Sequence, residues 1–148
     1  MLAKTEILSV VSALGDRIGK EALSTLFQED KSQSTQKIGH GQFRELAVLC
    51  GAAECPEEIE LLVRYNTAKA SANQSWAKKC GGRTFGALVL GCMEEIRGLE
   101  QDSNDLLTDL MHFFGYLYWQ SRIWTAENPA APGDDRQGNH GSRTERRA

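Results

Sequence analysis

Apolar residues recur at helical spacing over most of the chain, and this periodicity is the feature that most limits the fold. Between residues 85 and 99 the apolar positions repeat every three or four residues and so share one helix face: Leu88, Cys92, Ile96 and Leu99. Runs of Val, Ile and Thr at strand spacing are missing, and the chain has only three prolines. The sequence therefore predicts an all-α protein.

Polar and glycine-rich segments divide the periodic stretches, and the pattern predicts a bundle of about five helices. Helix propensity falls at Gly15 and Gly19, so we expect the first helix to bend or break there. Thr84 is placed to cap the fourth helix, and Ser103 or Asn104 to cap the fifth. The five helices are expected over about residues 4–27, 41–51, 56–79, 85–99 and 103–126.

One domain suits a chain of 148 residues, which is long enough to bury a hydrophobic core. We expect a single helical bundle over residues 1–126. The polar segment 28–41, "QEDKSQSTQKIGHG", has no periodicity and predicts a loop. Residues 127–148 contain Gly, Pro and charge with almost nothing to bury, so we predict a disordered C-terminal tail.

Neither a signal peptide nor a membrane span is expected. Charged residues interrupt the first apolar stretch at Glu6, Asp16 and Arg17, and no window holds 18 uninterrupted apolar residues. The cysteines lack a Cys-x-x-Cys pair, so we expect reduced, mostly buried thiols in a cytoplasmic protein. They are Cys50, Cys55, Cys80 and Cys92.

Acidic residues are absent between Glu60 and Glu94, although the whole chain has a net charge of −3. Residues 31–93 carry a net charge of +3, and residues 94–124 carry −4. Such segregation predicts two surfaces with different partners. The acid-free stretch holds five basic residues: Arg64, Lys69, Lys78, Lys79 and Arg83.

At 100° per residue, the expected helix over 56–79 divides into two faces. One face is apolar: Leu61, Tyr65, Ala68, Ala72 and Trp76. The other is polar, basic and acid-free: Arg64, Thr67, Ser71, Gln74 and Lys78. Such side chains neutralise phosphates and bond to phosphate or sugar, which suggests contact with a nucleic-acid backbone. A merely solvated face is the alternative, and Tyr65 and Trp76 are expected in the core.

The expected helix over 103–126 holds six aromatic residues, and its apolar side chains form two adjacent stripes. The first stripe is Leu106, Leu110, Phe113, Leu117 and Trp124, and the second is Leu107, Met111, Phe114 and Tyr118. Together they exceed the ~100° apolar arc of an ordinary surface helix. This favours a core helix buried on two sides. In the alternative, part of the second stripe meets a partner subunit.

Motifs of catalysis and cofactor binding are missing. The three histidines are far apart in sequence, and no phosphate-binding loop or catalytic triad pattern is present. Asp105, Asp109 and His112 share a helix face and could ligate a metal, but an acidic helix start is the simpler explanation. We therefore expect no enzymatic activity, no cofactor and no metal site.

Four segments in chain order carry a family resemblance: "QFREL", "ELLVRYNTAKA", "FGALVLGCMEEI" and "LMHFFGYLYWQSR". Over about residues 36–124 the chain resembles the helical small subunit of type III, Csm-type, CRISPR–Cas interference complexes. The resemblance implies a five-helix bundle in an antiviral ribonucleoprotein, stacked beside other effector subunits and copies of itself. It also implies no catalytic site.

The resemblance further implies contact with the backbones of guide RNA and target RNA. Carried over to this chain, the nucleic-acid-binding candidates are Arg44 in "QFREL" and Arg64, Lys69, Lys78 and Lys79 in the long helix. Arg83 joins them from the acid-free stretch. A helical protein–protein adaptor without a nucleic-acid role is the alternative function. No membrane partner is expected under either hypothesis.

Overall fold

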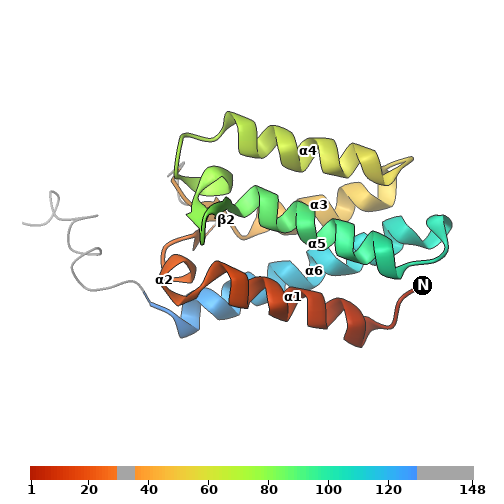
Figure 1. Cartoon of the computed structure of the whole chain (residues 1–148), viewed down its shortest axis with the longest axis horizontal. Helices are drawn as coiled ribbons and strands as arrows, with labels where there is room; N and C mark the ends of the chain where they lie inside the picture. The colour runs from red at the N-terminus through yellow and green to blue at the C-terminus, as the bar shows by residue number, and fades with distance from the viewer. Residues whose placement is uncertain (30–35, 130–148) are drawn as a thin grey trace, which may run out of the picture.

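Six α-helices make up most of the chain in the computed structural model, which describes residues 1–29 and 36–129. The expected all-α bundle is confirmed, and α2 is a short sixth helix that follows a break in the first (Figure 1). The helices are α1 (Lys4–Ile18), α2 (Lys20–Leu23), α3 (Gly41–Ala52), α4 (Pro56–Lys69), α5 (Phe85–Leu99) and α6 (Ser103–Glu127).

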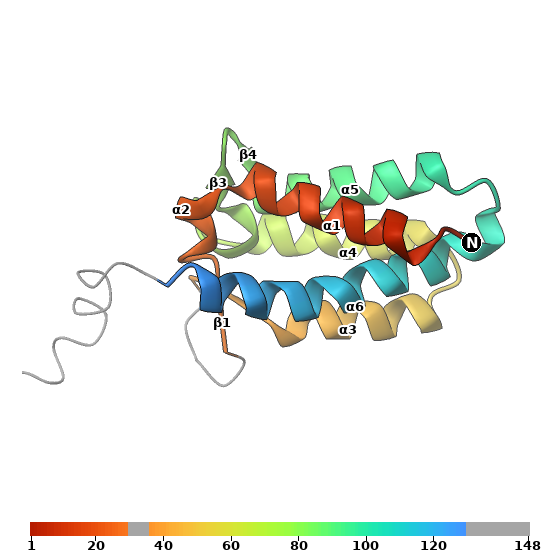
Figure 2. The ribbon, with the colours of Figure 1, turned by 90° about the horizontal axis from the view of Figure 1, so that it is seen from below.

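The long helix α6 packs mainly against α3 and α1, while α4 lies at the edge of the bundle, away from α1 (Figures 1 and 2). Buried residues of α6 come from both predicted stripes, since Phe113 and Phe114 are each fully buried. The second stripe also packs its half-buried Leu107, Met111 and Tyr118 against the core. The structure therefore confirms the interpretation of this segment as a core helix buried on two sides.

Gly19 breaks the first helix, because its backbone adopts a φ of +86°, a conformation that side chains disfavour. Gly15, the other expected position, lies inside α1 and is buried, so the helix does not break there. The helical segment ends at Leu23, not at residue 27, since Phe27 belongs to the short strand β1 (Phe27–Gln28).

The capping prediction is confirmed for α5 and is wrong for α6. Thr84 Oγ1 accepts a hydrogen bond of 3.1 Å from the backbone N–H of Ala87, and α5 has the predicted bounds. The cap of α6 lies one residue earlier than expected, because Asp102 accepts a 2.9 Å bond from the N–H of Asn104.

The expected helix over 56–79 is wrong in its last ten residues, because α4 ends at Lys69. A turn follows, in which Asn73 and Ser75 adopt positive φ, and then the 3₁₀ helix η1 (Ser75–Ala77). The physical cause is tertiary. Trp76 packs at 5.3 Å and 5.8 Å, centroid to centroid, against Phe85 and Phe43, which a continued helix at the edge of the bundle would not allow.

A small hairpin follows, made of β3 (Lys79–Cys80) and β4 (Arg83–Thr84) in antiparallel pairing. Its two-residue turn consists of Gly81 and Gly82, which both have positive φ, as tight hairpin turns require. The Gly-Gly dipeptide is the sequence signal for this strand pair, and it suits the end of a helix equally well.

The predicted loop over 28–41 is only partly correct. Its last residues form β2 (Ile38–Gly39), which pairs in parallel with β1, and Ile38 and His40 are buried. Residues 30–35 lie outside the described residues. The same holds for residues 130–148 of the predicted tail, whereas residue 127 still belongs to α6.

An aromatic cluster forms the centre of the core at the end of the bundle that carries the hairpin. Phe27 packs edge-on against Phe43 and Phe85 at 5.7 Å and stacks on Trp124 at 6.1 Å. Trp76 completes the cluster, so its predicted place in the core is confirmed. The cluster joins side chains from five segments, β1, α3, η1, α5 and α6, at the hairpin end of the fold.

Three of the four cysteines, Cys50, Cys80 and Cys92, are buried as expected, and Cys55 is half-buried. All four thiols are free, and burial raises the pKa of Cys50 and Cys92 to about 12. Over residues 1–29 and 36–129, none of the helices has both the length and the apolar character needed to cross a bilayer.

Candidate nucleic-acid interface

The two faces that were predicted for the helix over 56–79 do not form, because α4 ends at Lys69. Its buried residues are Ile59 and Val63, which point toward the core on the side covered by α5. The predicted apolar face is solvent-exposed, with relative exposures of 64% for Leu61 and 58% for Tyr65. The prediction of a buried Tyr65 is therefore wrong, because it relied on a helix continuing through Trp76.

Thr67, predicted on the basic face, instead lies at the contact between α4 and α5. Its hydroxyl donates a 2.9 Å hydrogen bond to the carbonyl of Val63, and its side chain fills the space beside Gly86. Any Cβ at position 86 would collide with Thr67. Arg64 remains exposed, so α4 contributes cations to the surface without the continuous polar stripe that was expected.

Five of the six predicted site residues lie on α4 and on the segment that follows it. Arg64 and Lys69 are exposed on the C-terminal half of α4, while Lys79 and Arg83 are exposed on the two strands of the hairpin. Lys78 is half-buried beside the hairpin. The end of α4 and the hairpin lie at the same end of the bundle (Figures 1 and 2). We call this region the basic end, and it consists of Arg64, Lys69, Lys78, Lys79 and Arg83.

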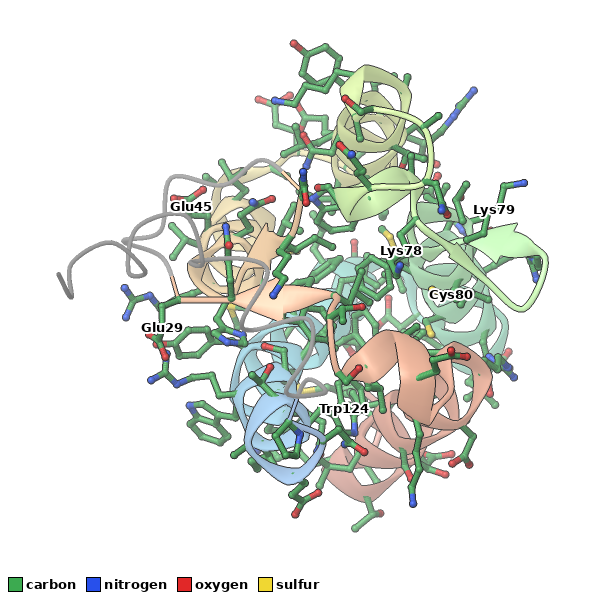
Figure 3. The ribbon with its side chains drawn as sticks, turned by 90° about the vertical axis from the view of Figure 1, so that its left-hand side faces the viewer. Glu29, Glu45, Lys78, Lys79, Cys80 and Trp124 are labelled. Atoms are coloured by element: carbon green, nitrogen blue, oxygen red, sulfur yellow. The ribbon has the colours of Figure 1, made fainter. Side chains whose placement is uncertain are left out.

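Arg44 is separate from the basic end. It is exposed on α3, and its guanidinium carbon lies 5.3 Å from the ring centre of Tyr118 on α6. In Figure 3, Lys79 points away from the bundle on the hairpin, whereas Glu45, the neighbour of Arg44 in sequence, lies on the opposite side. The structure therefore does not bring Arg44 together with the hairpin cations.

The cations of the basic end form no ion pair with any residue in the described ranges. The carboxylates that border the acid-free stretch lie elsewhere and pair with Arg97 at the C-terminal end of α5. Arg97 contacts Glu60 at 2.5 Å, Glu57 at 3.6 Å and Glu94 at 3.9 Å. The charge segregation in the sequence thus becomes a separation between opposite ends of α4 and α5.

Sequence reasoning missed Arg17, which is exposed at the end of α1. The hairpin turn lies beside it, since a Cβ at Gly81 would be 3.8 Å from the carbonyl oxygen of Arg17. Nothing in the local sequence predicts this proximity, because it depends on how the hairpin folds back against α1.

A groove of about 850 Å³ lies between α3 and α4, next to η1. Lys69 of the basic end lines it together with Lys37, a cation outside the predicted set. Gln42 on the groove wall accepts a 2.9 Å hydrogen bond from the indole N–H of the buried Trp76. The groove therefore has two lining side chains that are held together by a hydrogen bond, and it carries positive charge from two separate segments.

Two of the three α6 residues that were considered as possible metal ligands, Asp105 and Asp109, have other partners. Asp105 accepts a 2.8 Å hydrogen bond from the amino group of Met1, and the fully buried Asp109 accepts one of 3.1 Å from the N–H of Leu2. No group of three His, Cys, Asp or Glu side chains in the described ranges is arranged to hold a metal ion. Burial, followed by a hydrogen bond with Glu100, raises the pKa of Asp109 to about 6.

The exposed apolar residues of α6 are not the ones expected to meet a partner. Trp119 and Ile123 have relative exposures of 63% and 46%, whereas Leu107, Met111 and Tyr118 of the predicted stripe are half-buried. Tyr116 lies next to Trp119, with ring centres 6.1 Å apart. Surface aromatic residues of this kind are common in protein–protein contacts.

Searches with protein-family models, among curated proteins and among solved structures found no significant match to this chain.

Proposed function

We propose that this chain is a non-catalytic subunit of a cytoplasmic CRISPR ribonucleoprotein, where it contacts the backbones of guide and target RNA and stacks with neighbouring subunits. The observation that carries the proposal is the basic end. Its exposed cations have no carboxylate partners in the described part of the chain, while the acids at the opposite end of α4 and on α5 pair with Arg97. The resemblance of residues 36–124 to Csm-type small subunits supports the same function.

Unpaired cations suit a phosphate backbone, because each Lys or Arg that neutralises a phosphate releases a condensed counterion. Contacts of this kind recognise charge and shape, and sequence is recognised by base pairing between the RNA strands. The acidic opposite end would repel the same polyanion. The chain therefore binds RNA in one orientation, with the hairpin and the end of α4 toward the nucleic acid.

Exposed apolar side chains favour a second candidate, a helical protein–protein adaptor. Trp119 and Ile123 on α6, with Leu61 and Tyr65 on α4, present two apolar surfaces at different places on the bundle. A subunit that stacks in an assembly would use such surfaces as well. They therefore support binding to other subunits under both hypotheses and do not separate them.

Purification of the native complex separates the two candidates. The tagged full-length chain is isolated from its own cells at moderate salt, and the absorbance ratio at 260 and 280 nm is measured before and after ribonuclease treatment. We expect co-purifying RNA of guide length, with less RNA retained after Arg64→Ala and Lys79→Ala. The matched control is Lys4→Ala, an exposed cation at the other end of α1. Protein partners without RNA would favour the adaptor.

A further inference from the structure

The groove between α3 and α4 has the size and the walls of a ligand site. Its volume of about 850 Å³ falls within the ~300–1,000 Å³ of small-ligand pockets. Apolar and polar side chains both line it. The apolar ones are Leu46, Leu49, Leu62 and Trp76, of which Leu46 and Trp76 are almost fully buried, and the polar ones include Lys37, Gln42, Glu45, Asn66, Lys69, Ser71 and Ser75.

Positive charge exceeds negative charge along the lining. Lys37 comes from the segment before β2, Lys69 comes from the last turn of α4, and neither forms an ion pair with a described residue. Glu45 is the one carboxylate in the described lining, and it is exposed on α3. The Nζ of Lys69 lies 5.0 Å from the ring centre of Tyr65, which does not line the groove, and a bound phosphate group would draw Lys69 toward Lys37.

Several polar side chains of the lining keep hydrogen-bonding groups that are not used by the described residues. Gln42 uses its carbonyl oxygen to accept from Trp76, which leaves its NH₂ group to donate. The side chains of Asn66, Ser71 and Ser75 also lack partners within residues 1–29 and 36–129. Amides and hydroxyls that both donate and accept suit the hydroxyl groups of a ribose.

The turn that closes the groove is held by specific contacts. The N–H of Ser75 donates a 2.8 Å hydrogen bond to the carbonyl of Gln36, and Asn73 accepts one of 3.1 Å from the N–H of Lys79. Ser75 adopts a φ of +53°. This backbone conformation is costly for a residue with a side chain, and residues that adopt it are concentrated at functional sites. The groove is thus shaped before any ligand arrives.

We infer that this groove binds a nucleotide of single-stranded RNA and distinguishes it from DNA by its 2′-hydroxyl. The phosphate lies between Lys37 and Lys69, the ribose hydroxyl bonds to Asn66 and the serines, and the base lies against the partly exposed Leu49 and Leu62. This inference rests on the proposed function and adds one site to it. The basic end supplies affinity for any phosphate backbone, whereas the groove supplies the preference for RNA.

The test uses the purified full-length chain and two fluorescent probes, an oligouridylate of roughly ten nucleotides and the oligodeoxyuridylate of equal length, which differ only in the 2′-hydroxyl. We expect the RNA to bind about 5–10-fold more tightly, as one or two hydrogen bonds would give. Asn66→Ala should remove this preference by weakening RNA binding alone. Lys69→Gln should weaken both probes equally, because a phosphate contact does not distinguish them.

Asn104→Ala is the matched control, because Asn104 is exposed at the start of α6, away from the groove. It should leave both affinities unchanged, and circular dichroism checks that every variant folds. Equal wild-type affinity for the two probes, or a preference that survives Asn66→Ala, would overturn the groove assignment while leaving RNA binding by the basic end intact. Competition by polyglutamate that is as strong as competition by unlabelled RNA would also overturn the groove assignment, because binding would then depend on negative charge alone. Absence of RNA binding by the wild-type chain would instead count against the proposed function.

Discussion

The indole of Trp124 lies directly against Gly15, so closely that a Cβ at position 15 would be 2.6 Å from ring atom Cζ2. This contact sets the distance between α1 and the end of α6. It also explains why α1 keeps a glycine inside a regular helix, where alanine would be favoured by ~1 kcal/mol. The space that Gly15 leaves for Trp124 therefore outweighs the low helix propensity of glycine.

Gly15→Ala is therefore expected to destabilise the fold by about 1–3 kcal/mol, because the added methyl group forces Trp124 out of place. Urea unfolding followed by tryptophan fluorescence measures the change. Gly91→Ala on α5 is the matched control, since a Cβ at that position would have no atom within 4 Å, and it should stabilise by about 0.5–1 kcal/mol. The account of this contact is wrong if both substitutions raise the urea midpoint.

Ser121 forms a buried link between α6 and the start of α3. Its hydroxyl donates a 3.1 Å hydrogen bond to the carbonyl of Tyr118, so its oxygen accepts the 2.9 Å bond from Nδ1–H of His40. Ser121→Ala removes that acceptor inside the core and should destabilise by about 1–3 kcal/mol in thermal or urea unfolding. Ser12→Ala, on the exposed side of α1, should change stability by less than about 0.5 kcal/mol. Equal stability of the two variants would contradict the role of this bond.

Asp109 should make the fold more stable at mildly acidic pH. Burial and the neighbouring Glu100 raise its pKa from 3.8 to about 6, so the folded state favours the protonated carboxyl. This contribution is complete below about pH 4 and is lost as pH rises through 6. The amino group of Met1, 3.3 Å from Glu100, is the cation that faces the pair.

Asp109→Asn keeps the side chain neutral and still accepts from the N–H of Leu2. We expect this variant to be more stable than the wild type at pH 7.5 by ~1–2 kcal/mol, with the difference vanishing near pH 4. Urea unfolding at the two pH values measures it, and Asp16→Asn on exposed α1 reports the effect of the same substitution at a surface position. A variant that is less stable than the wild type at pH 7.5 would refute the assignment.

Local signals predicted the fold where local physics decides the structure. Thr84 predicted the start of α5, and the two apolar stripes predicted that α6 is a core helix. The end of α4 could not be predicted in this way. It depends on Trp76 packing against Phe43, which is distant in sequence, and against Phe85, which lies beyond the β3–β4 hairpin.

The sequence predicted which cations belong to the candidate site, but it did not predict how they are arranged on the surface. The absence of acids between Glu60 and Glu94 identified the cations of the basic end, and their lack of ion pairs in the described structure agrees with that pattern. Arg17 and Lys37 were missed because only the folded hairpin and groove bring them close to the other cations. Helical projection also misplaced Tyr65, since it assumed a helix ten residues longer than α4.

The salt dependence of RNA binding tests the central claim most directly. Affinity of the full-length chain for a labelled single-stranded RNA is measured from low to moderate salt, for the wild type and for Arg64→Ala/Lys79→Ala/Arg83→Ala. We predict that log K falls linearly with log salt, and that the triple variant reduces the slope by about 2, since each phosphate that is no longer neutralised accounts for about 0.7. Lys4→Ala should leave the slope unchanged. Wild-type and triple-variant slopes that coincide, or a wild-type chain that does not bind the RNA, would contradict the account.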